Sequence, residues 1–292
     1  AMHFSEAKGI LSARGGMNIY RGCTHGCIYC DSRSRCYQIN HDFEDIEVKR
    51  NAPELLEQKL SSKRKKCMIG TGAMCDPYMH CEAELGLMRR CLEIIKRRGF
   101  GVTVHTKSDL ILRDISIIEE INAKSKAVVQ MTLTTADKNL CRVIEPAVCT
   151  TDGRAKVLAE CRKRKIPTVV WLSPFLPFIN DTEQNVRRLM EICVQEKVRG
   201  IICFKIGLTL REGNREYFYS KLDQHFPGLK EKYIRTYGNA YEVTSPDNDR
   251  LLQIIRTECE KNGIEWRLEK VFEYLNTFPE EKQAAAQGML EF

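Results

Sequence analysis

The stretch that decides the fold is Asn18-Ile-Tyr-Arg-Gly-Cys-Thr-His-Gly-Cys-Ile-Tyr-Cys-Asp31, which places Cys23, Cys27 and Cys30 in a C-x3-C-x2-C spacing. On a regular helix the outer two thiols would lie about 10 Å apart along the axis. The two glycines of the stretch also disfavour a helix. We therefore expect a loop that gathers the three thiols, and thiols gathered in this way usually hold a metal.

Three thiolates suit either an iron–sulfur cluster or zinc, and the number of protein ligands separates the two cases. A site closed by four cysteines is structural, whereas an open site is reactive; Cys36 is the nearby candidate for closure. Without it, the thiols fit a [4Fe-4S] cluster with one iron left open to the amino and carboxylate groups of S-adenosylmethionine. Reductive cleavage of the sulfonium would give a 5′-deoxyadenosyl radical, chemistry that belongs to the cofactor while the protein positions and shields it.

The loop resembles the signature of the radical SAM superfamily, in which Tyr29 occupies the usual aromatic position before the last cysteine. The resemblance runs from about residue 8 to about residue 268. It narrows to the spore photoproduct lyase-like (DNA repair photolyase-like) branch through Gly22-Cys-x-His-x-Cys-x-Tyr-Cys30, Gly70-Thr-Gly-Ala-Met-Cys-Asp-Pro-Tyr78, Thr106-Lys-Ser108, Arg142-x-x-Glu-Pro146 and Pro174-x-x-Pro177.

The composition describes a chain of 292 residues, long enough for one large α/β domain or two small ones. No apolar run is long enough to span a bilayer, so we expect no membrane association. The 14 cysteines lie largely in apolar helical patterns, which indicates a reducing compartment and predicts a cytoplasmic location. The net charge of +7 leaves a nucleic-acid partner open, although the basic runs at 63–66, 96–98 and 162–165 lie near predicted helix ends, where such residues are usually solvated.

Helical patterns alternate with short β-rich runs along most of the chain, which predicts right-handed βαβ units and a parallel sheet. About six units precede residue 206. The prediction is an α/β fold: a partial (β/α)6 TIM-type barrel of the radical SAM type over 1–206, with the cluster loop at 23–30, and a C-terminal α/β extension over 207–292 packed on it. The expected helices are Pro53–Leu60, Glu84–Arg98, Asp109–Ala123, Asp152–Lys165, Thr182–Lys197 and Asn248–Lys261; the expected strands are Cys67–Ile69, Val102–Thr106, Ala127–Leu133, Thr168–Leu172, Gly200–Lys205 and a last one at Ile264–Leu268.

In such barrels the chemistry lies on the loops that follow the strands, where every motif quoted above falls. By the resemblance, the segment after the second strand, with Thr71 and Gly72, holds the methionyl amino group through backbone carbonyls. Asp76 lies in the same segment and could instead cap a helix. Lys107, at the end of the third strand, is expected to pair with the carboxylate of S-adenosylmethionine, and Tyr29 to help seat the cofactor.

Further contacts to the ribose and carboxylate of S-adenosylmethionine are expected from Thr132, Thr134 and Arg142. Arg142 could instead form a structural ion pair with Glu145. The lyase-like branch returns a hydrogen atom to a product radical from a cysteine, and Cys75 is the candidate donor here. A small buried core residue is the alternative use of this cysteine.

These observations predict an enzyme that abstracts hydrogen from its substrate with a 5′-deoxyadenosyl radical. A DNA lesion is the substrate that the resemblance favours. A small molecule, a peptide or RNA is the alternative within the same chemistry, and a zinc-stabilised nucleic-acid-binding module is the alternative of another class. The expected partners are S-adenosylmethionine, an electron donor such as flavodoxin or ferredoxin, and a nucleic acid.

Overall fold

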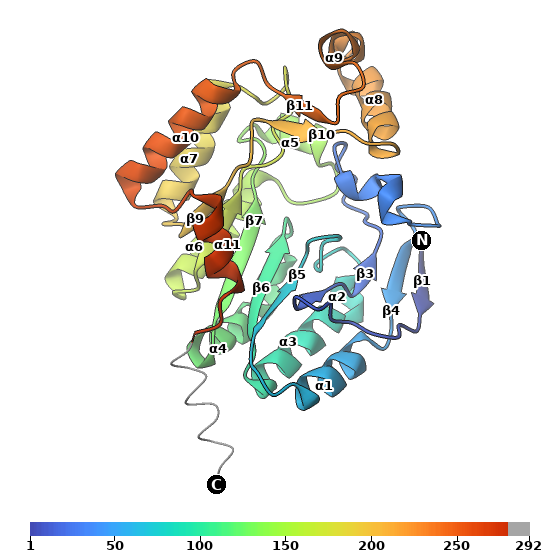
Figure 1. Cartoon of the computed structure of the whole chain (residues 1–292), viewed down its shortest axis with the longest axis vertical. Coiled ribbons are helices and arrows are strands. Elements are labelled where there is room, and N and C mark those ends of the chain that lie inside the picture. The colour runs from blue at the N-terminus through green and yellow to red at the C-terminus, as the bar shows by residue number, and fades with distance from the viewer. Residues whose placement is uncertain (280–292) are drawn as a thin grey trace.

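Six parallel strands form the central sheet, in the order β2-β5-β6-β7-β8-β9 (Figure 1). The structure is a computed structural model and describes residues 1–279. The β-branched residues of these segments favour extended backbone. The strands are β2 (Gly16–Met17), β5 (Met68–Thr71), β6 (Gly101–Thr106), β7 (Ala127–Thr132), β8 (Thr168–Trp171) and β9 (Gly200–Ile202).

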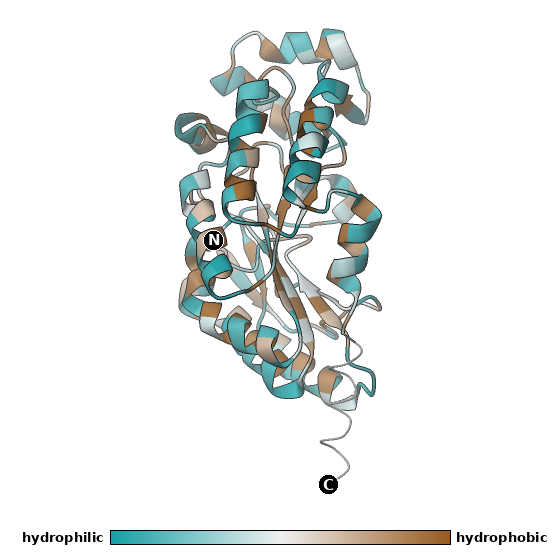
Figure 2. Ribbon diagram, turned by 90° about the vertical axis from the view of Figure 1, so that its left-hand side faces the viewer, coloured by the Kyte–Doolittle hydropathy of each residue, from teal (hydrophilic) through white to brown (hydrophobic). Residues whose placement is uncertain are grey.

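Helices connect successive strands and cover the convex face of the sheet. Figure 2 shows hydrophobic segments along the strands and hydrophilic segments on the outer sides of the helices. In the third of these helices Met88, Leu92 and Ile95 are buried, and Gly99 ends the helix in the left-handed region at φ 69°. The helices are α1 (Ala52–Ser62), α2 (Glu82–Leu85), α3 (Leu87–Arg98), α4 (Ile115–Lys124), α5 (Lys138–Ile144), α6 (Thr151–Lys163) and α7 (Glu183–Gln195).

Alternate residues of each strand face the two sides of the sheet. Val102 and Val104 of β6 belong to the core beneath the helices. The residues between and beyond them, Thr103 and His105, therefore face the concave side. Short connections and helices on one face complete the predicted partial (β/α)6 TIM-type barrel, which the structure confirms.

A small sheet of three strands lies beside the barrel at its N-terminal edge, in the order β1-β4-β3. Its third strand leads directly into the loop of the three cysteines, so the small sheet anchors that loop. The strands are β1 (Met2–Ser5), β3 (Tyr20–Arg21) and β4 (Ile46–Lys49), and two 3-10 turns, η1 (Asp31–Arg33) and η2 (Arg35–Tyr37), follow the cysteines.

The C-terminal region packs in three places, one of which is the contact of Val271 and Leu275 with the central sheet. Its helix α10 shares the main core with the central sheet, and a second core joins the cysteine loop to the region near β10 and α8 through Tyr29, Leu208 and Phe218. The predicted boundary at residue 206 stays a prediction. The elements are β10 (Gly207–Thr209), α8 (Asn214–His225), α9 (Leu229–Tyr237), β11 (Glu242–Thr244), α10 (Asn248–Asn262) and α11 (Leu268–Asn276).

Some boundaries differ from the sequence prediction. The helix expected over Glu84–Arg98 is interrupted at Gly86, which adopts φ 60°, and the first turns of the helix expected from Asp109 form a 3-10 helix, η3 (Asp109–Asp114). The prediction of a last strand is wrong, because Glu265 forms only an isolated bridge to Gly200 before α11 begins. The sequence also predicts a frayed helix from about Asn276, and that segment lies almost wholly outside the described residues.

The basic run at 63–66 follows α1, the run at 96–98 forms the last turn of α3, and the run at 162–165 begins in the last turn of α6. All three lie at the ends of the strands opposite the cysteine loop. Arg97 and Arg98 pair with Glu57 there. Within residues 1–279 no helix combines the length and the hydropathy needed to cross a bilayer.

Candidate active site

Backbone hydrogen bonds hold the cysteine loop. The amide of Cys23 donates to the carbonyl of Phe43 at 2.9 Å, that of Ile28 to Ile144 at 3.0 Å, and that of Cys30 to Cys27 at 3.3 Å. Gly22 turns the chain at φ 89°, where a Cβ atom would lie 2.6 Å from the carbonyl oxygen of Phe43. The segment is thus a loop, as its glycines predict, and it is fastened from both sides.

The loop and the ends of β5 and β6 enclose a cavity of about 180 Å³. The structure therefore brings together most of the residues singled out in the sequence, although they come from three segments. Those that line the cavity are Cys23, Cys27, Cys30, Tyr29, Gly72, Cys75, Asp76 and Lys107.

The three thiols of the loop share the cavity with one further thiol, that of Cys75, whose Sγ atom is hydrogen-bonded to the carbonyl of Tyr20. Cys36 is exposed, and its sulfur accepts a hydrogen bond from Arg211 at 3.2 Å, outside the cavity. A tetrahedral zinc with bonds of about 2.3 Å would hold its sulfurs about 3.8 Å apart. Within residues 1–279, the one group of three ligand atoms within 4.8 Å of one another lies elsewhere on the molecule, so the three sulfurs are farther apart than in a tetrahedral zinc site.

A positively charged group between these thiols is also needed if they are to bind a metal as thiolates. Burial raises the pKa of Cys27 to about 12, and burial together with the charges of Cys27 and Cys30 raises the pKa of Cys23. The thiolates that bind metals are therefore costly here without a cation. An iron–sulfur cluster fits this donor set, because it binds thiolates and offsets their mutual repulsion.

Lys107 brings an ammonium group to the same cavity. Within the described part of the chain, its Nζ atom has no hydrogen bond or ion pair, and its backbone amide donates to Asp76 at 2.8 Å. Burial opposes its charge, but the neighbouring Cys27, Glu145 and Asp76 raise its pKa overall. A charged donor without a partner is available for an anionic ligand group.

Asp76 joins the loop after β5 to the end of β6. One carboxylate oxygen accepts from the Tyr78 amide at 2.9 Å and from the Thr106 hydroxyl at 2.6 Å, and the other accepts from the Lys107 amide. Burial alone would raise the pKa of this carboxyl, but His25 and these donors lower it. Its acceptor sites are thus occupied by the protein, and Asp76 positions the backbone of Lys107.

Gly72 lets the loop after β5 pass close to the next strand. It adopts φ 97°, and a Cβ atom there would lie 1.9 Å from the carbonyl oxygen of His105. Thr71, the last residue of β5, is buried beside it. Only glycine allows this approach, which sets the wall of the cavity.

Glu145 connects the cysteine loop to the helical layer. It accepts a hydrogen bond from the hydroxyl of Tyr29, and its second oxygen lies 2.6 Å from Arg154. Arg154 also donates to the carbonyl of Thr132 at 3.1 Å. The ion pair of Glu145 is therefore with Arg154, a residue that the sequence analysis missed; its position three and four residues before the buried Val157 and Leu158 indicated an inward face.

Comparisons with known proteins agree with this geometry. The sequence model of the radical SAM superfamily matches residues 17–190. The chain belongs to the radical SAM superfamily. Proteins of this superfamily use two cofactors, a [4Fe-4S] cluster and S-adenosylmethionine. We therefore expect this chain to use both.

Two relatives with similar sequences are named only as uncharacterized proteins. A protein of Mycobacterium tuberculosis is 28% identical over 235 residues, which cover 78% of this chain and 68% of the relative. A protein of Methanocaldococcus jannaschii is 30% identical over 176 residues, covering 60% of this chain and 65% of the relative. Among solved structures, spore photoproduct lyase complexed with a dinucleoside spore photoproduct has a TM-score of 0.65 at 12% identity, covering 91% of this chain and 81% of the lyase. That likeness shows the radical SAM fold.

Four of the predicted cofactor residues are not among those that line the cavity: Thr71, Thr132, Thr134 and Arg142. Thr132 ends β7, and its hydroxyl lies 2.8 Å from Nε2 of His105. Thr134 is buried behind it, and its hydroxyl has no hydrogen-bond partner among residues 1–279. Arg142 is exposed on α5, and no ion pair joins it to Glu145 in this part of the chain.

Cys75 lines the cavity from below. Its Sγ atom donates to the carbonyl of Tyr20 at 2.6 Å, and burial, followed by the charge of Asp76, raises its pKa to about 12. It is therefore a protonated thiol. Cys141 is fully buried, and its sulfur lies 3.5 Å from Glu145, away from the cavity.

Aromatic side chains continue from the cavity along the concave face of the barrel. His105, which lines the cavity, stacks on Trp171 with ring centroids 4.9 Å apart and an angle of 13°. Trp171 donates to Gln130 at 2.8 Å and lies 6.2 Å from the ring of Phe204, which is 55% exposed. Burial, followed by the charge of Lys107, lowers the pKa of His105 to about 3, so the imidazole is neutral. These three rings, His105, Trp171 and Phe204, form the aromatic shelf.

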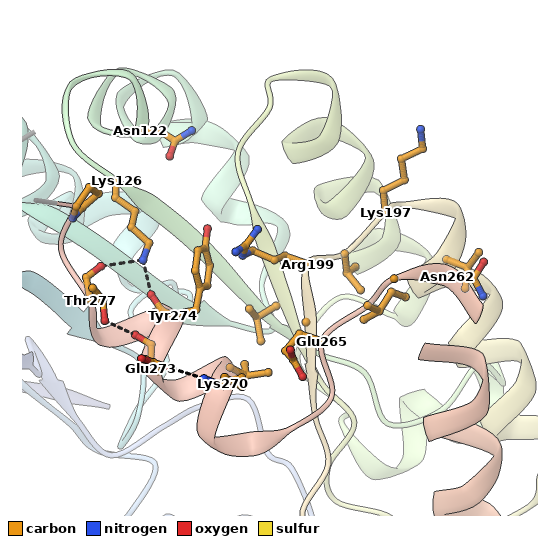
Figure 3. A pocket seen from close by; sticks show the side chains of 18 of the residues that line it. Asn122, Lys126, Lys197, Arg199, Asn262, Glu265, Lys270, Glu273, Tyr274 and Thr277 are labelled. Atoms are coloured by element: carbon orange, nitrogen blue, oxygen red, sulfur yellow. Dashed lines mark hydrogen bonds and ion pairs between the residues drawn. The ribbon is translucent and has the colours of Figure 1, made fainter. Parts of the chain in front are cut away.

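A larger hollow of about 1300 Å³ lies at the opposite ends of the strands (Figure 3). There Lys126 donates to the carbonyls of Tyr274 and Thr277, and Arg199 stacks on the ring of Tyr274 at 3.9 Å. These contacts hold α11 against the sheet. The hollow shares no residue with the cavity of the cysteines.

Proposed function

We propose that this radical SAM protein cleaves S-adenosylmethionine reductively at a cluster held by Cys23, Cys27 and Cys30, and abstracts hydrogen from a substrate on the concave face of its barrel. The observation that carries the proposal is the cavity itself. The three thiols of the loop share it with the unpaired ammonium of Lys107, and the further thiol that lines it, that of Cys75, is hydrogen-bonded to Tyr20. When bound, the cluster and S-adenosylmethionine supply the electron transfer and the 5′-deoxyadenosyl radical; the protein supplies position and shielding.

The anionic end of S-adenosylmethionine is assigned to Lys107. Among the described residues, its ammonium is the charged donor without a protein partner in the cavity, and Asp76 holds its backbone. An ion pair shielded from water is stronger than one at the surface. The backbone carbonyls near Thr71 and Gly72 are assigned to the amino group of S-adenosylmethionine. Gly72 supports this role, because it has no side chain between the backbone and the cavity.

Tyr29 is assigned a place beside the cofactor, with its hydroxyl held by Glu145. Arg154 fixes Glu145 and the end of β7 together, so it acts as a positioning residue. Thr132 reaches the cavity only through His105. The ribose of S-adenosylmethionine can contact Thr132, Thr134 and Arg142 only if the bound cofactor extends beyond the cavity. It would then lie toward the ends of β7 and α5.

The aromatic shelf favours a planar group in the substrate. Aromatic rings stack on bases and similar rings with a free energy of about 1 to 3 kcal/mol per base. Trp171 stacks on His105, which lines the cavity, and Phe204, beside Trp171, offers an exposed ring for such stacking. Together with the likeness to spore photoproduct lyase in fold, this supports a lesion-containing nucleobase as the substrate and a nucleic acid as the partner. An indole-like or flavin-like small molecule, or RNA, is the second candidate.

Cys75 is assigned as the hydrogen-atom donor that ends the reaction. Its thiol is protonated at neutral pH and lines the cavity, and its hydrogen must turn from the carbonyl of Tyr20 toward the product radical. Transfer of that hydrogen atom to a carbon radical of the product leaves a sulfur radical. One electron from a reduced flavodoxin or ferredoxin and one proton from water restore the thiol.

The substrate is tested by anaerobic assays with S-adenosylmethionine and reductant. We expect the yield of 5′-deoxyadenosine to rise with a dinucleoside that carries a thymine lesion, and not with the undamaged dinucleoside. Phe204→Ala should remove that increase, whereas Ile234→Ala, an exposed residue of α9, should keep it. An increase with a small planar metabolite instead would assign the second candidate, and an equal yield with every compound would contradict a lesion substrate.

The donor is tested by the isotope in the product. In D2O the thiol exchanges its hydrogen, so the parent protein should deliver deuterium to the product and Cys75→Ala should not. Cys141→Ala, which changes a buried thiol outside the cavity, is the matched control.

A further inference from the structure

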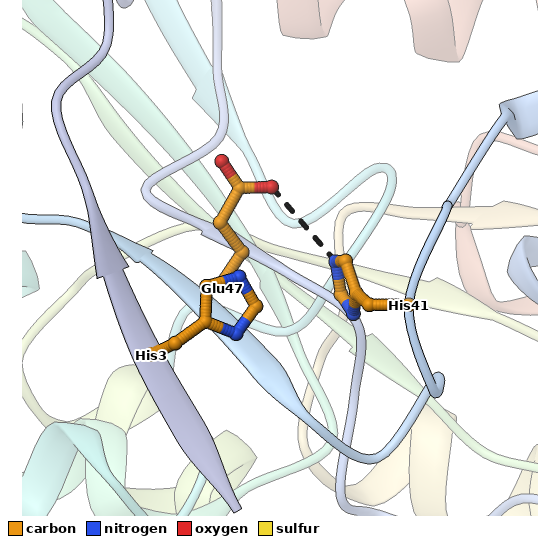
Figure 4. A group of neighbouring side chains, drawn as sticks. All are labelled: His3, His41 and Glu47. Atoms are coloured by element: carbon orange, nitrogen blue, oxygen red, sulfur yellow. Dashed lines mark ion pairs between the residues drawn. The ribbon is translucent and has the colours of Figure 1, made fainter.

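Two histidines and a glutamate converge at the small N-terminal sheet (Figure 4). His3 of β1 and Glu47 of β4 are direct partners in the parallel register of these strands. His41 comes from the segment between η2 and β4. One ring nitrogen of each histidine and one carboxylate oxygen of Glu47 lie within 4.8 Å of one another.

The hydrogen bonds of both rings determine which nitrogen carries the proton. Nδ1 of His41 lies 2.9 Å from the carbonyl oxygen of Asp42, which can only accept. Nδ1 of His3 lies 3.0 Å from the carboxylate of Asp45, which accepts when ionised. Both rings therefore hold their proton on Nδ1, which leaves the lone pair on Nε2.

Nε2 of His41 has no partner for that lone pair. The atom is buried, it makes no hydrogen bond among residues 1–279, and a carboxylate oxygen of Glu47 lies 3.9 Å from it. A lone pair and an anionic oxygen that face each other repel unless a proton or a metal cation lies between them, and a metal cation can also accept the Nε2 lone pair of His3. Imidazoles held at Nδ1 by a carbonyl or carboxylate are the usual arrangement of metal-binding histidines.

We propose that His3, His41 and Glu47 bind a divalent transition metal of the zinc type, separate from the iron–sulfur cluster. Two imidazole nitrogens and one carboxylate oxygen are ligands that Zn²⁺, Co²⁺ and Ni²⁺ share. With bonds of about 2.0 to 2.2 Å, the ligand atoms of a tetrahedral site are about 3.3 Å apart. The side chains of His3, His41 and Glu47 are 44%, 20% and 22% exposed, so small rotations toward solvent-accessible space close the site around the ion.

The metal braces the cysteine loop. Phe43 lies between the ligands His41 and Glu47 in the chain, its carbonyl accepts the amide of Cys23, and its side chain lines the cavity. Fixing both ends of this short segment fixes the acceptor of the first cluster cysteine. The same ion fastens β1, and thus the start of the chain, to β4.

The test uses a protein that lacks the cluster thiols, Cys23→Ala/Cys27→Ala/Cys30→Ala, so that zinc and cobalt cannot bind there. After treatment with a chelator, calorimetric titration with Zn²⁺ should show one site per chain, and Co²⁺ should give the visible absorption of a nitrogen- and oxygen-ligated ion. His41→Ala and Glu47→Gln in this background should weaken binding at least tenfold. His225→Ala, an exposed histidine of α8, should bind as its parent does.

Thermal unfolding gives a second readout in the native sequence. Zn²⁺ should raise the Tm of the cluster-loaded protein and leave that of its His41→Ala variant unchanged, because a ligand stabilises only the state that binds it. Equal Zn²⁺ affinity in the parent and both ligand variants, or no binding by the parent, would overturn the proposal. Neither result affects the proposal of an iron–sulfur cluster, because the titrated protein lacks the three cluster cysteines.

Discussion

Glu145 and Arg154 form an ion pair from which water is excluded: Oε2 of Glu145 lies 2.6 Å from Nη2 of Arg154, and both side chains are 0% exposed. The pair stands between Tyr29 of the cysteine loop and the end of β7, so one buried contact holds two walls of the site. A buried ion pair contributes little over an apolar pair of the same shape, but removal of one partner is costly.

Glu145→Gln should therefore lower the free energy of unfolding by about 3 to 5 kcal/mol, because Arg154 is left charged and buried. Tyr29→Phe removes one hydrogen bond from the same carboxylate and should cost about 1 to 2 kcal/mol. Urea unfolding of the cluster-free proteins measures both. Equal stability of Glu145→Gln and the parent would show that the pair is not needed for folding.

The same carboxyl gives a pH dependence of known sign. Burial by itself raises the pKa of Glu145, but Arg154 and Lys107 lower it below the ordinary 4.5. A lowered pKa stabilises the fold above the ordinary value and ceases to do so as the pH falls through the folded value. The stability difference between the parent and Glu145→Gln should thus be largest at neutral pH and shrink below about pH 4.5. A difference that grows on acidification would contradict this.

Lys107→Met should weaken the binding of S-adenosylmethionine at least tenfold, since it removes the unpaired charged donor of the cavity. Arg142→Ala, at an exposed position on α5, serves as the comparison and should change the affinity less than twofold. Equilibrium dialysis of the reconstituted proteins measures both constants. If Arg142→Ala lowered the affinity for S-adenosylmethionine more than Lys107→Met, the carboxylate of the cofactor would have to bind near α5 instead.

Gly72→Ala and Gly99→Ala compare two left-handed glycines. At Gly99 an added Cβ atom would meet nothing within 4 Å, so alanine should cost only the backbone strain of about 1 to 2 kcal/mol. At Gly72 the added carbon meets the carbonyl of His105, and we expect at least twice that loss together with loss of bound iron. Chemical denaturation measures the loss of stability, and iron analysis measures the loss of bound iron. Equal losses of stability for Gly72→Ala and Gly99→Ala would contradict the close approach of Gly72 to His105.

Much of the fold and the site could be predicted because the signals are local. The alternation of helical and β-rich segments predicts the parallel sheet, and the glycines and cysteines of one stretch predict the loop. The position of Lys107 at the C-terminal end of a strand predicts that it lies at the edge of the sheet where such barrels carry their active sites. These inferences need no knowledge of pairing between distant segments.

The rest depends on contacts that sequence patterns do not encode. Arg154 carried a weak signal in its helical spacing, but its partner could not be read from the chain. The meeting of His3 with Glu47 follows from the pairing of β1 with β4, two strands of four residues each. Glu265 makes a single bridge rather than a strand because α11 begins three residues later and packs Val271 and Leu275 against the concave face of the sheet.

The central claim is that three cysteines hold a cluster with an iron left open to S-adenosylmethionine. The most direct measurement is the 5′-deoxyadenosine formed when the anaerobically reconstituted protein is reduced in the presence of S-adenosylmethionine. We expect about four iron atoms per chain and steady formation of 5′-deoxyadenosine in the parent and in Cys36→Ala, and neither in Cys27→Ala. A parent protein that holds its full iron and forms no 5′-deoxyadenosine, or that needs Cys36 to hold the iron, would contradict the account.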